Sequence, residues 1–323
     1  MKTMSGNDIS RSLRTMAGVL LLGVMCACNK GDDIYVPEQP GGNTEGPGTE
    51  MAQLELIVSK KGGLLGPKTW SDGNTLGLFL TERALGRPYR EDADIYSNIK
   101  AYMLAGTWYL TPKQVMLTGQ EAVVYAYSPY ISGVDPFAVP VDTDKGIDYM
   151  YGTHLESQKG VDNVNPTAAI EMQHALSLIH LKVRKNHNFK AQAKLQEISL
   201  EAADDSLKLP VKGTLDIQTG KLTPDGYGRY TLQGLQQVLP DEYADSCTYR
   251  MFVIPRDNAE GEVQLTIKVN GNTLSMPLKD GNDWLQGVQN TYNIVFDGDD
   301  MRIEKVEINQ WKEINIDGEI EGK

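Results

Sequence analysis

Residues 263–278 read Val-Gln-Leu-Thr-Ile-Lys-Val-Asn-Gly-Asn-Thr-Leu-Ser-Met-Pro-Leu and carry the clearest secondary-structure signal in the chain. Apolar and polar residues alternate from Val263 to Val269, which is the period of a strand with one buried face. Asn270-Gly271 follows at once, and this dipeptide is the strongest short-range signal for a two-residue β-hairpin turn. The segment therefore predicts two antiparallel strands, over 263–269 and 273–278.

Alternation of the same kind runs through most of the chain. Ala105-Gly106 and Thr219-Gly220 each interrupt an alternating run and predict further hairpins. In Val123–Tyr127 both alternating sets are apolar, which predicts a strand that is covered on both faces. No long helical period occurs outside the N-terminal segment, and Phe189–Leu195 is the best short helical candidate. Short strands with turn residues between them favour an all-β fold of sandwiches over a parallel α/β sheet.

Length and composition limit the classes of protein. The 323 residues allow roughly two domains, and a polar stretch at 157–166 predicts the boundary between residues 51–160 and 161–323. The chain has 43 acidic and 31 basic residues and a net charge of −12. This balance argues against nucleic acid as a partner, because nucleic-acid binders concentrate Lys and Arg. Three Cys exclude a disulfide-rich scaffold.

The N-terminus has the composition of a targeting signal. Three basic residues precede an apolar run over 16–25, which is too short to span a bilayer. Met-Cys-Ala-Cys follows, and the arrangement resembles a bacterial lipoprotein signal, in which a small residue precedes the lipidated Cys. The resemblance implies that residues 1–27 are a signal peptide and that Cys28, with Cys26 as the alternative, receives the lipid. A plain secretory peptide is the other interpretation.

Residues 28–50 are predicted to form a flexible tether, because they are rich in Pro and Gly and nearly free of apolar residues. Within them, Asn29-Lys30-Gly31-Asp32-Asp33 resembles the surface-export signal of Bacteroidetes-type lipoproteins. The resemblance implies an outer-membrane lipoprotein that faces outward. Stable anchoring needs more than one acyl chain, so palmitate is expected beside the diacylglycerol.

Residues for catalysis or metal binding are scarce. The chain has four His and no HExxH motif that would supply a zinc site. Asp142, Asp144, Gly146 and Asp148 superficially resemble a calcium loop, but Thr153 stands where the bidentate Glu is required. We therefore predict no metal, no cofactor, no catalytic residue and a protein that is not an enzyme. A carboxylate pair for glycoside hydrolysis stays open as a minor alternative.

Trp70, Trp108, Trp284 and Trp311 allow two interpretations. Large aromatic residues supply much of the burial in a sandwich core, and this interpretation is favoured. On an exposed face, the tryptophans, with Tyr109 next to Trp108, would instead form a platform on which sugars stack. That platform would make the protein a glycan binder.

Six segments between residues 74 and 311 share motifs, in order, with one protein family. The segments are Asn74–Phe79; Trp108 with Val123–Tyr130; Asp148–Gly152; His174–Ile179; Trp284 with Gly287 and Tyr292; and Ile308-Asn309 with Trp311. Together they resemble the fimbrillin family, the subunits of type V pili. The resemblance implies two transthyretin-like β-sandwich domains in tandem after a flexible lipidated tether.

The family resemblance also implies assembly by donor-strand exchange. In the family a trypsin-like protease cuts after the first strand, which leaves, and a C-terminal strand of a neighbouring subunit takes its place. The apolar alternation over 54–58 gives the first strand here, and the loop over 59–72 offers Lys60, Lys61 and Lys68 as processing sites. The family's processing favours Arg, and this loop has none.

The C-terminal residues have the pattern of a donor strand. Ile314, Ile316 and Ile320 lie on one side of an alternating run over 312–321, opposite a polar and acidic side. A donor strand places such residues in the pockets of its acceptor while its backbone pairs with an exposed sheet edge. An ordinary edge strand of the second domain would have the same pattern, so both interpretations stay open.

Together, the sequence and the resemblance predict a non-enzymatic fimbrial subunit, or an adhesin-like surface lipoprotein, that assembles by protease-triggered donor-strand exchange. Its expected partners are other fimbrial subunits, a processing protease, outer-membrane lipid through the acyl group and, as a further option, a host glycan or protein. The expected location is the outer membrane and the fimbrium at the cell surface. The alternative function is a non-polymerising outer-membrane lipoprotein that binds glycan.

Overall fold

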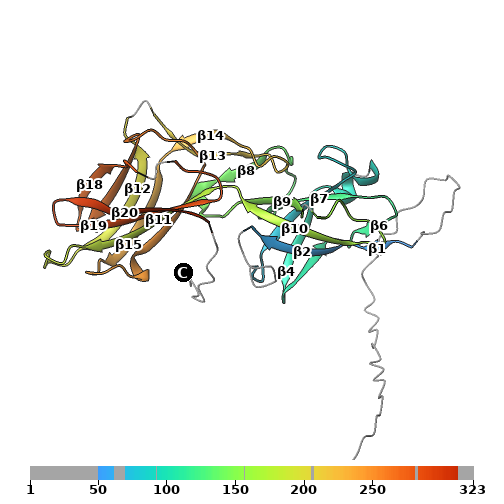
Figure 1. Cartoon of the computed structure of the whole chain (residues 1–323), viewed down its shortest axis with the longest axis horizontal. Coiled ribbons are helices and arrows are strands. Elements are labelled where there is room, and N and C mark those ends of the chain that lie inside the picture. Colours follow the sequence, from blue (N-terminus) through green and yellow to red (C-terminus); the bar gives the residue numbers. More distant parts are fainter. Residues whose placement is uncertain are drawn as a thin grey trace, which may run out of the picture. The chain divides into compact units, whose positions relative to one another are not determined.

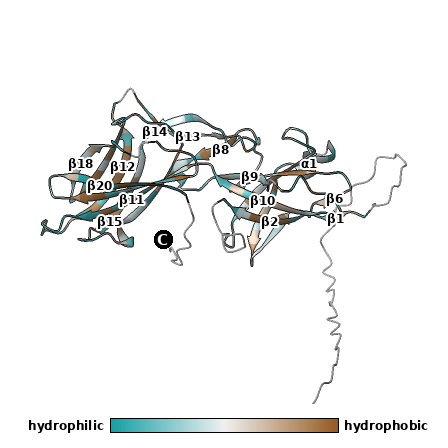
Figure 2. Ribbon diagram, in the orientation of Figure 1, coloured by the Kyte–Doolittle hydropathy of each residue, from teal (hydrophilic) through white to brown (hydrophobic). Residues whose placement is uncertain are grey.

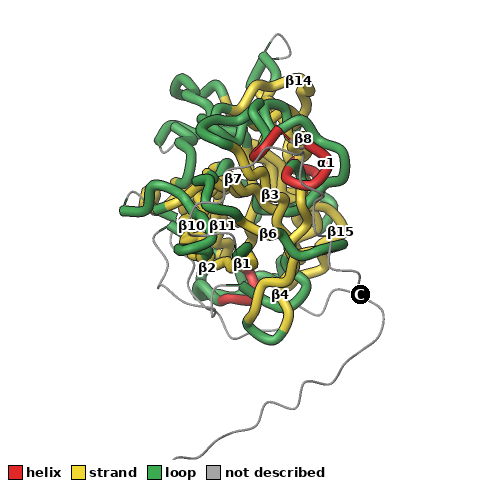
Figure 3. Tube along the Cα trace, turned by 90° about the vertical axis from the view of Figure 1, so that its right-hand side faces the viewer, coloured by secondary structure: helices red, strands yellow, loops and turns green. Residues whose placement is uncertain are grey.

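The structure is a computed structural model that describes residues 50–61, 70–91, 93–155, 157–204, 207–280 and 283–311. All of these residues fall within one compact unit, Pro37–Lys323. Figure 3 shows strands, in yellow, as the main regular structure, with short helical segments in red. The helical segments are η2 (Tyr89–Glu91), α1 (Ala93–Tyr96), η3 (Thr143–Lys145) and η4 (Asp245–Cys247). The all-β prediction is confirmed.

Seven strands form the largest sheet, in the order β2-β10-β9-β7-β3-β4-β5. Neighbouring strands are antiparallel except β2 and β10, which run parallel. A two-stranded sheet of β1 (Ala52–Gln53) and β6 (Met116–Leu117) accompanies it. The strands are β2 (Glu55–Lys60), β3 (Thr75–Thr81), β4 (Ile99–Leu104), β5 (Thr107–Thr111), β7 (Val123–Ser128), β9 (Met150–His154) and β10 (Thr167–His174).

One face of the seven-stranded sheet carries the first hydrophobic core. Leu76, Leu78 and Leu80 of β3 and Val124 and Ala126 of β7 are all buried in it. Their spacing of two residues places them on the same face, because successive side chains of a strand point to opposite faces. Figure 2 shows the hydrophobic residues, in brown, concentrated in the strands.

The other face of β3 and β7 is also covered. Phe79 and Tyr127 point into another core with Val139, Val141 and Leu215. These last residues come from a three-stranded sheet in the order β14-β13-β8. Its strands are β8 (Val139–Asp142), β13 (Leu209–Leu215) and β14 (Leu222–Gly228). The prediction that Val123–Tyr127 is covered on both faces is confirmed.

Two four-stranded sheets form a sandwich from residue 177 onward (Figure 1). Their orders are β16-β11-β19-β20 and β15-β12-β17-β18. The inner faces enclose another core, in which Ile179, Leu181 and Val183 of one sheet meet Leu265 and Ile267 of the other. The strands are β11 (Ser177–Lys185), β12 (Lys194–Ala202), β15 (Tyr230–Val238), β16 (Thr248–Val253), β17 (Val263–Val269), β18 (Asn272–Pro277), β19 (Val288–Phe296) and β20 (Met301–Gln310).

The turn residues of the predicted hairpins adopt the backbone conformation that such turns require. Asn270 and Gly271 have φ angles of 50° and 85° and join β17 to β18, and Ala105 and Gly106 have φ angles of 49° and 78° and join β4 to β5. A type I′ turn needs positive φ at both central residues. The third predicted hairpin, around Thr219-Gly220, joins β13 to β14.

Phe189–Leu195 is not a helix, so this prediction was wrong. Lys194 begins β12, and the ring of Phe189 packs edge-on against Phe296 at 5.2 Å between centroids. Ala193 and Leu195 are both fully buried in the sandwich core. Burial against the core outweighs the weak helical propensity of this short segment.

The hydrogen-bonded sheets are not divided at residue 160. β10 lies beyond that position in the sequence, yet it pairs with β9 and β2 of the large sheet. β8 lies before it, yet pairs with β13. Between β7 and β11 the chain therefore changes sheet three times: to the three-stranded sheet at β8, back to the large sheet at β9, and to the sandwich at β11.

Candidate functional site

Among the residues that the structure describes, the first strand of the large sheet pairs with one neighbour. β2 is the terminal strand in the sheet order, and its register with β10 runs from Glu55 opposite Thr167 to Lys60 opposite Met172. Val58 is 5% exposed and belongs to the first core, whereas Ile57 on the opposite face is 60% exposed. The strand thus supplies one apolar side to the core and holds to the sheet along a single edge.

The structure describes two of the three lysines that the sequence offers as processing sites, and they differ in their surroundings. Lys60 is half-buried, and its Nζ lies 4.7 Å from the centre of the Trp70 ring, which is the geometry of a cation–π contact. Lys61 is exposed; its backbone N–H donates to the Met172 carbonyl (2.7 Å) and its Nζ donates to Gln173 Oε1 (3.3 Å). Lys61 is therefore the more accessible of the two for a protease.

Trp70 connects the two edge strands of the large sheet. It is 6% exposed and packs in the first core. Its ring meets Trp108 of β5 edge-on, at 5.3 Å between centroids and 73° between planes, and carries Lys60 of β2 on its face. Because β2 and β5 are the first and last strands in the sheet order, Trp70 closes the space between them.

The tryptophans occupy packing positions. Trp284 is fully buried, Trp311 is 8% exposed, and Trp108 is half-buried against the first core. This placement favours the core interpretation over a sugar platform built from Trp70 and Trp108. The exposed aromatic feature nearby is a pair of stacked tyrosines, Tyr102 and Tyr109, at 5.6 Å between centroids and 26° between planes.

A second cluster lies where β20 ends. Trp311 stacks on His174 with a centroid distance of 3.7 Å and an angle of 8°, and on Phe252 at 5.4 Å and 20°. His174 is 4% exposed, and its Nδ1 lies 2.9 and 3.1 Å from the two carboxylate oxygens of Asp148. The sequence offers no local signal for this cluster, because Asp148, His174 and Trp311 belong to segments far apart in the chain.

The aspartates with calcium-loop spacing have structural roles. Asp142 Oδ1 accepts a hydrogen bond from the Asp144 backbone N–H (3.2 Å) at the start of η3, which ends at Gly146 with a φ of 61°. Asp148 holds His174. Among the residues that the structure describes, no three or more His, Cys, Asp or Glu side chains are grouped to hold a metal ion.

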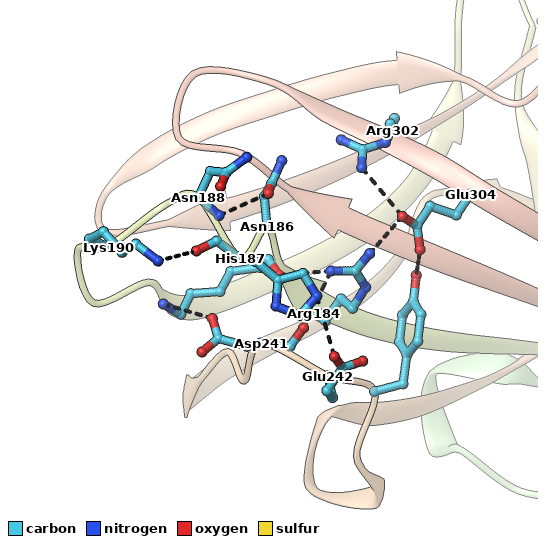
Figure 4. A network of polar contacts seen from close by, with 11 residues as sticks. Arg184, Asn186, His187, Asn188, Lys190, Asp241, Glu242, Arg302 and Glu304 are labelled. Atoms are coloured by element: carbon cyan, nitrogen blue, oxygen red, sulfur yellow. Dashed lines mark hydrogen bonds and ion pairs between the residues drawn. The ribbon is translucent and has the colours of Figure 1, made fainter.

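A network of charges ties the edge strand β20 to the sandwich (Figure 4). Arg184 Nη2 donates to Glu304 Oε1 at 2.6 Å, and the Tyr243 hydroxyl donates to Glu304 Oε2 at 2.9 Å. Glu304 is the extra residue of a β-bulge, opposite the step from Asn293 to Ile294 in β19. A bulge can redirect a side chain, and here the Glu304 carboxylate meets Arg184.

The contacts in this network shift the pKa values of Glu304 and Tyr243. The hydrogen bond from Arg184 lowers the pKa of Glu304. Burial, and then the hydrogen bond with Glu304, raise the pKa of Tyr243 to about 12. Close by, the Lys185 ammonium lies 3.1 Å from Asp241 Oδ1 and lowers the pKa of that carboxyl. The shifts of Glu304 and Asp241 come from ion pairs that join strands and a loop.

His180 lies on the outer face of β11, and its pKa is below that of an ordinary histidine. Burial, followed by the charges of Arg250 and Lys182, lowers the pKa of His180 to about 4. Its Nδ1 lies 3.3 Å from Gln289 Nε2, which fits a neutral ring that accepts the amide N–H. His180 is therefore neutral near pH 7 and takes part in a polar layer on the sheet.

Several predicted site residues lie outside the described part of the chain. They are Cys26, Cys28, Lys68, Ile314, Ile316 and Ile320. Cys247, the remaining cysteine, is free and fully buried. Within the described ranges, no helix has the length and apolar character needed to cross a membrane.

Comparison with protein families finds one match, which covers most of the chain. Residues 66–311 match the model of the family described as fimbrillin-like. No curated protein matches the sequence.

Solved structures of similar fold come from Bacteroides species. A candidate cell adhesion protein from Bacteroides ovatus superposes with a TM-score of 0.61 at 15% identity, covering 82% of this chain and 100% of its own. A candidate cell adhesion protein from Bacteroides uniformis gives 0.56 at 15% identity, with 81% and 99% covered. A fimbrial protein from Bacteroides vulgatus gives 0.51 at 12% identity, with 81% and 100% covered. At these identities the likeness concerns the fold.

Proposed function

This chain belongs to the fimbrillin-like family, and from that membership we propose that it is a non-enzymatic fimbrial subunit or adhesin of the cell surface. We further propose that it assembles by donor-strand exchange after proteolytic removal of its first strand. The observation that carries this finer proposal is the placement of β2, an edge strand with one hydrogen-bonded neighbour, immediately before the exposed Lys61. Its partners would then be other fimbrial subunits and a processing protease.

Loss of β2 would open an acceptor site for another strand at the edge of the seven-stranded sheet. Leu54 and Val58 are 2% and 5% exposed, so their departure uncovers apolar core surface. β10, which now pairs with β2, would present a row of unpaired backbone N–H and C=O groups. An incoming strand with alternating apolar residues would cover the exposed core with its side chains and pair its backbone with β10. Ile314, Ile316 and Ile320 give the C-terminal segment that alternation, so we propose it as the donor strand.

The proposal is tested by nicking the mature protein with a Lys-specific protease. The expected result is a ladder of SDS-resistant oligomers that appears only after cleavage at Lys60, Lys61 or Lys68. Deletion of residues 312–323 should abolish the ladder without preventing cleavage. A nicked protein that stays monomeric in both forms would exclude self-polymerisation and leave tip or anchor roles.

Matched variants identify the cleaved lysine. Because Lys61 is exposed and Lys60 is half-buried over Trp70, Lys61→Gln should slow cleavage more than Lys60→Gln. Lys279→Gln serves as the control, because Lys279 is exposed and follows β18 of the sandwich, outside the large sheet; it should leave both cleavage of the loop and ladders unchanged. Mass spectrometry of the released N-terminal fragment gives the cut site directly.

We also propose that Cys28 carries the lipid and places the protein in the outer membrane. The support is the small-residue and Cys pattern of the N-terminal signal. In cells, Cys28→Ser should release the protein from the membrane fraction and remove incorporated palmitate, whereas Cys26→Ser should keep both. The reverse outcome would move the lipid to Cys26.

A glycan-binding lipoprotein is the second candidate, and the stacked pair Tyr102 and Tyr109 is what favours it. Tyr109 is 39% exposed and sits on the terminal strand β5. Aromatic faces with a phenolic hydroxyl suit the apolar faces and hydroxyls of sugars. This function requires binding on a glycan array that falls when Tyr109 becomes Ala and is unchanged when the exposed Tyr227 becomes Ala.

A further inference from the structure

The strand that leads to the C-terminal segment is weakly buried along most of its length. Within the described part of the chain, β20 is the terminal strand of its sheet and its one partner is β19. From Arg302 to Gln310 none of its side chains is buried, and Ile308 is 55% exposed. Met301 at its start and Trp311 just after its end are buried. Ile303 and Val306 are half-buried against the sandwich core, so full side-chain burial is limited to the two ends of the strand.

Trp311 contacts three segments other than its own strand. Its ring lies between His174, at the end of β10, and Phe252, in β16. Its backbone N–H donates to the carbonyl of Gly287, just before β19, at 2.9 Å. At 8% exposure it buries most of a large aromatic surface, the kind of contact that dominates packing energy.

His174 is itself fixed in place. Both carboxylate oxygens of Asp148 lie within 3.1 Å of its Nδ1. The next residue, Ala175, donates its backbone N–H to the carbonyl of Tyr149 at 2.8 Å. The imidazole therefore presents a rigid face to Trp311, and the large sheet supports that face through β9 and β10.

We infer that Trp311 is a tension anchor: it transfers force applied to the segment 312–323 into β10, β16 and the turn before β19, and so keeps β20 from peeling off its sheet. An edge strand pulled from one end loses its hydrogen bonds in succession, and each bond contributes little by itself. The aromatic stack at Trp311 must break before the first of those bonds is loaded. The proposed function supplies the source of the force, since a fimbrial subunit holds its neighbour through one segment, but the anchor is a property of the monomer.

Single-molecule pulling on the full mature chain tests the inference. Handles are attached at the tether and after Lys323, and the readout is the force of the extension event whose gain in length matches release of β20 (Met301–Gln310). Trp311→Ala should lower that force clearly, and His174→Ala, which removes one face of the stack, should lower it less. Ile308→Ala is the matched control on the same strand and should leave the force unchanged, because this side chain is exposed.

The experiment needs no pilus, so failure of strand exchange and failure of the anchor give different results. Far-UV circular dichroism and the later unfolding events show whether each variant is folded. If Trp311→Ala does not fold, Phe252→Ala and His174→Ala carry the test. Detachment of β20 at the same force in wild type and in every stack variant would overturn the inference, as would an equal effect of Ile308→Ala.

Discussion

The ammonium of Lys60, at the end of β2, lies 4.7 Å from the centre of the Trp70 ring, and the same ring packs against Trp108 of β5. This contact links the strand proposed to leave with the first tryptophan of the chain. One side chain thus contacts both edge strands of the seven-stranded sheet, an arrangement that we call the Trp70 closure. The Trp70 closure has measurable consequences for both stability and cleavage.

Trp70→Ala should destabilise the protein and speed cleavage after Lys60. Removal of a buried tryptophan leaves a cavity and typically costs about 3–5 kcal/mol. The lost cation–π contact adds about 0.5–1 kcal/mol and frees the Lys60 side chain. Urea unfolding gives the first quantity, and the rate of nicking by a Lys-specific protease at low dose gives the second. Trp70→Phe keeps an aromatic face and should recover most of the stability and most of the resistance to cleavage. An equal cleavage rate in the wild type, Trp70→Ala and Trp70→Phe would contradict the Trp70 closure.

Gly77→Ala should be strongly destabilising because of a steric clash. A Cβ at this position would lie 2.0 Å from Cε1 of Tyr127. The ring cannot move away easily, since its hydroxyl is within 2.7 Å of Asn98 Oδ1 and 2.8 Å of the Ile131 carbonyl. Overpacking of this kind costs about 1–3 kcal/mol in a packed core, and more where the neighbours are held in place.

Gly119→Ala is the control for that prediction. The nearest atom to its Cβ would be Asn163 Oδ1 at 3.7 Å, an ordinary contact distance. The urea midpoint of the Gly119→Ala variant should stay close to that of the wild type. Equal midpoints for Gly77→Ala and Gly119→Ala would show that β7 can shift away from β3.

His180 should make the protein less stable as the pH falls from 6.5 toward 4. Its pKa in the folded protein is about 4, below the ordinary value of 6.5, so the unfolded chain binds the proton more readily in this range. The stabilising contribution of the neutral ring is therefore complete above pH 6.5 and is lost as the pH falls to about 4. His180→Gln should flatten the pH dependence of the unfolding free energy there, and the exposed His187→Gln should not. A single NMR titration of His180 near 6.5 would argue against this account.

Glu304→Gln should weaken the attachment of β20 to the sandwich. The Arg184 side chain is 10% exposed and would lose its charged partner, which costs about 1–3 kcal/mol. Because Arg184 lowers the pKa of Glu304 below its ordinary value of 4.5, the pair stabilises the fold above pH 4.5 and is lost as the pH falls through the lower folded value. The variant should lack that acid-sensitive part of the unfolding curve.

Glu260→Gln is the matched control for the charge change, since Glu260 is exposed. It should leave both the unfolding free energy and its acid dependence at the wild-type values. An identical loss in the two variants would mean that net charge, and not the Arg184 contact, accounts for the effect.

Local sequence determined the strands and their turns. Alternation over 263–269 and the Asn270-Gly271 turn are properties of a few adjacent residues, and the hairpin of β17 and β18 follows from them. The family resemblance rests on the same kind of short segment. The helical prediction at Phe189–Leu195 failed where local propensity was weak and core burial took over.

Only the tertiary structure decided which distant residues meet. The parallel pairing of β2 with β10 joins residues more than a hundred positions apart, and no periodicity in either strand specifies its partner. The same holds for Trp311 between His174 and Phe252, and for Lys60 on Trp70 against Trp108. The physical reason is that alternation fixes which face of a strand is buried, whereas the neighbour of each strand is chosen by the packing of whole sheets around shared cores.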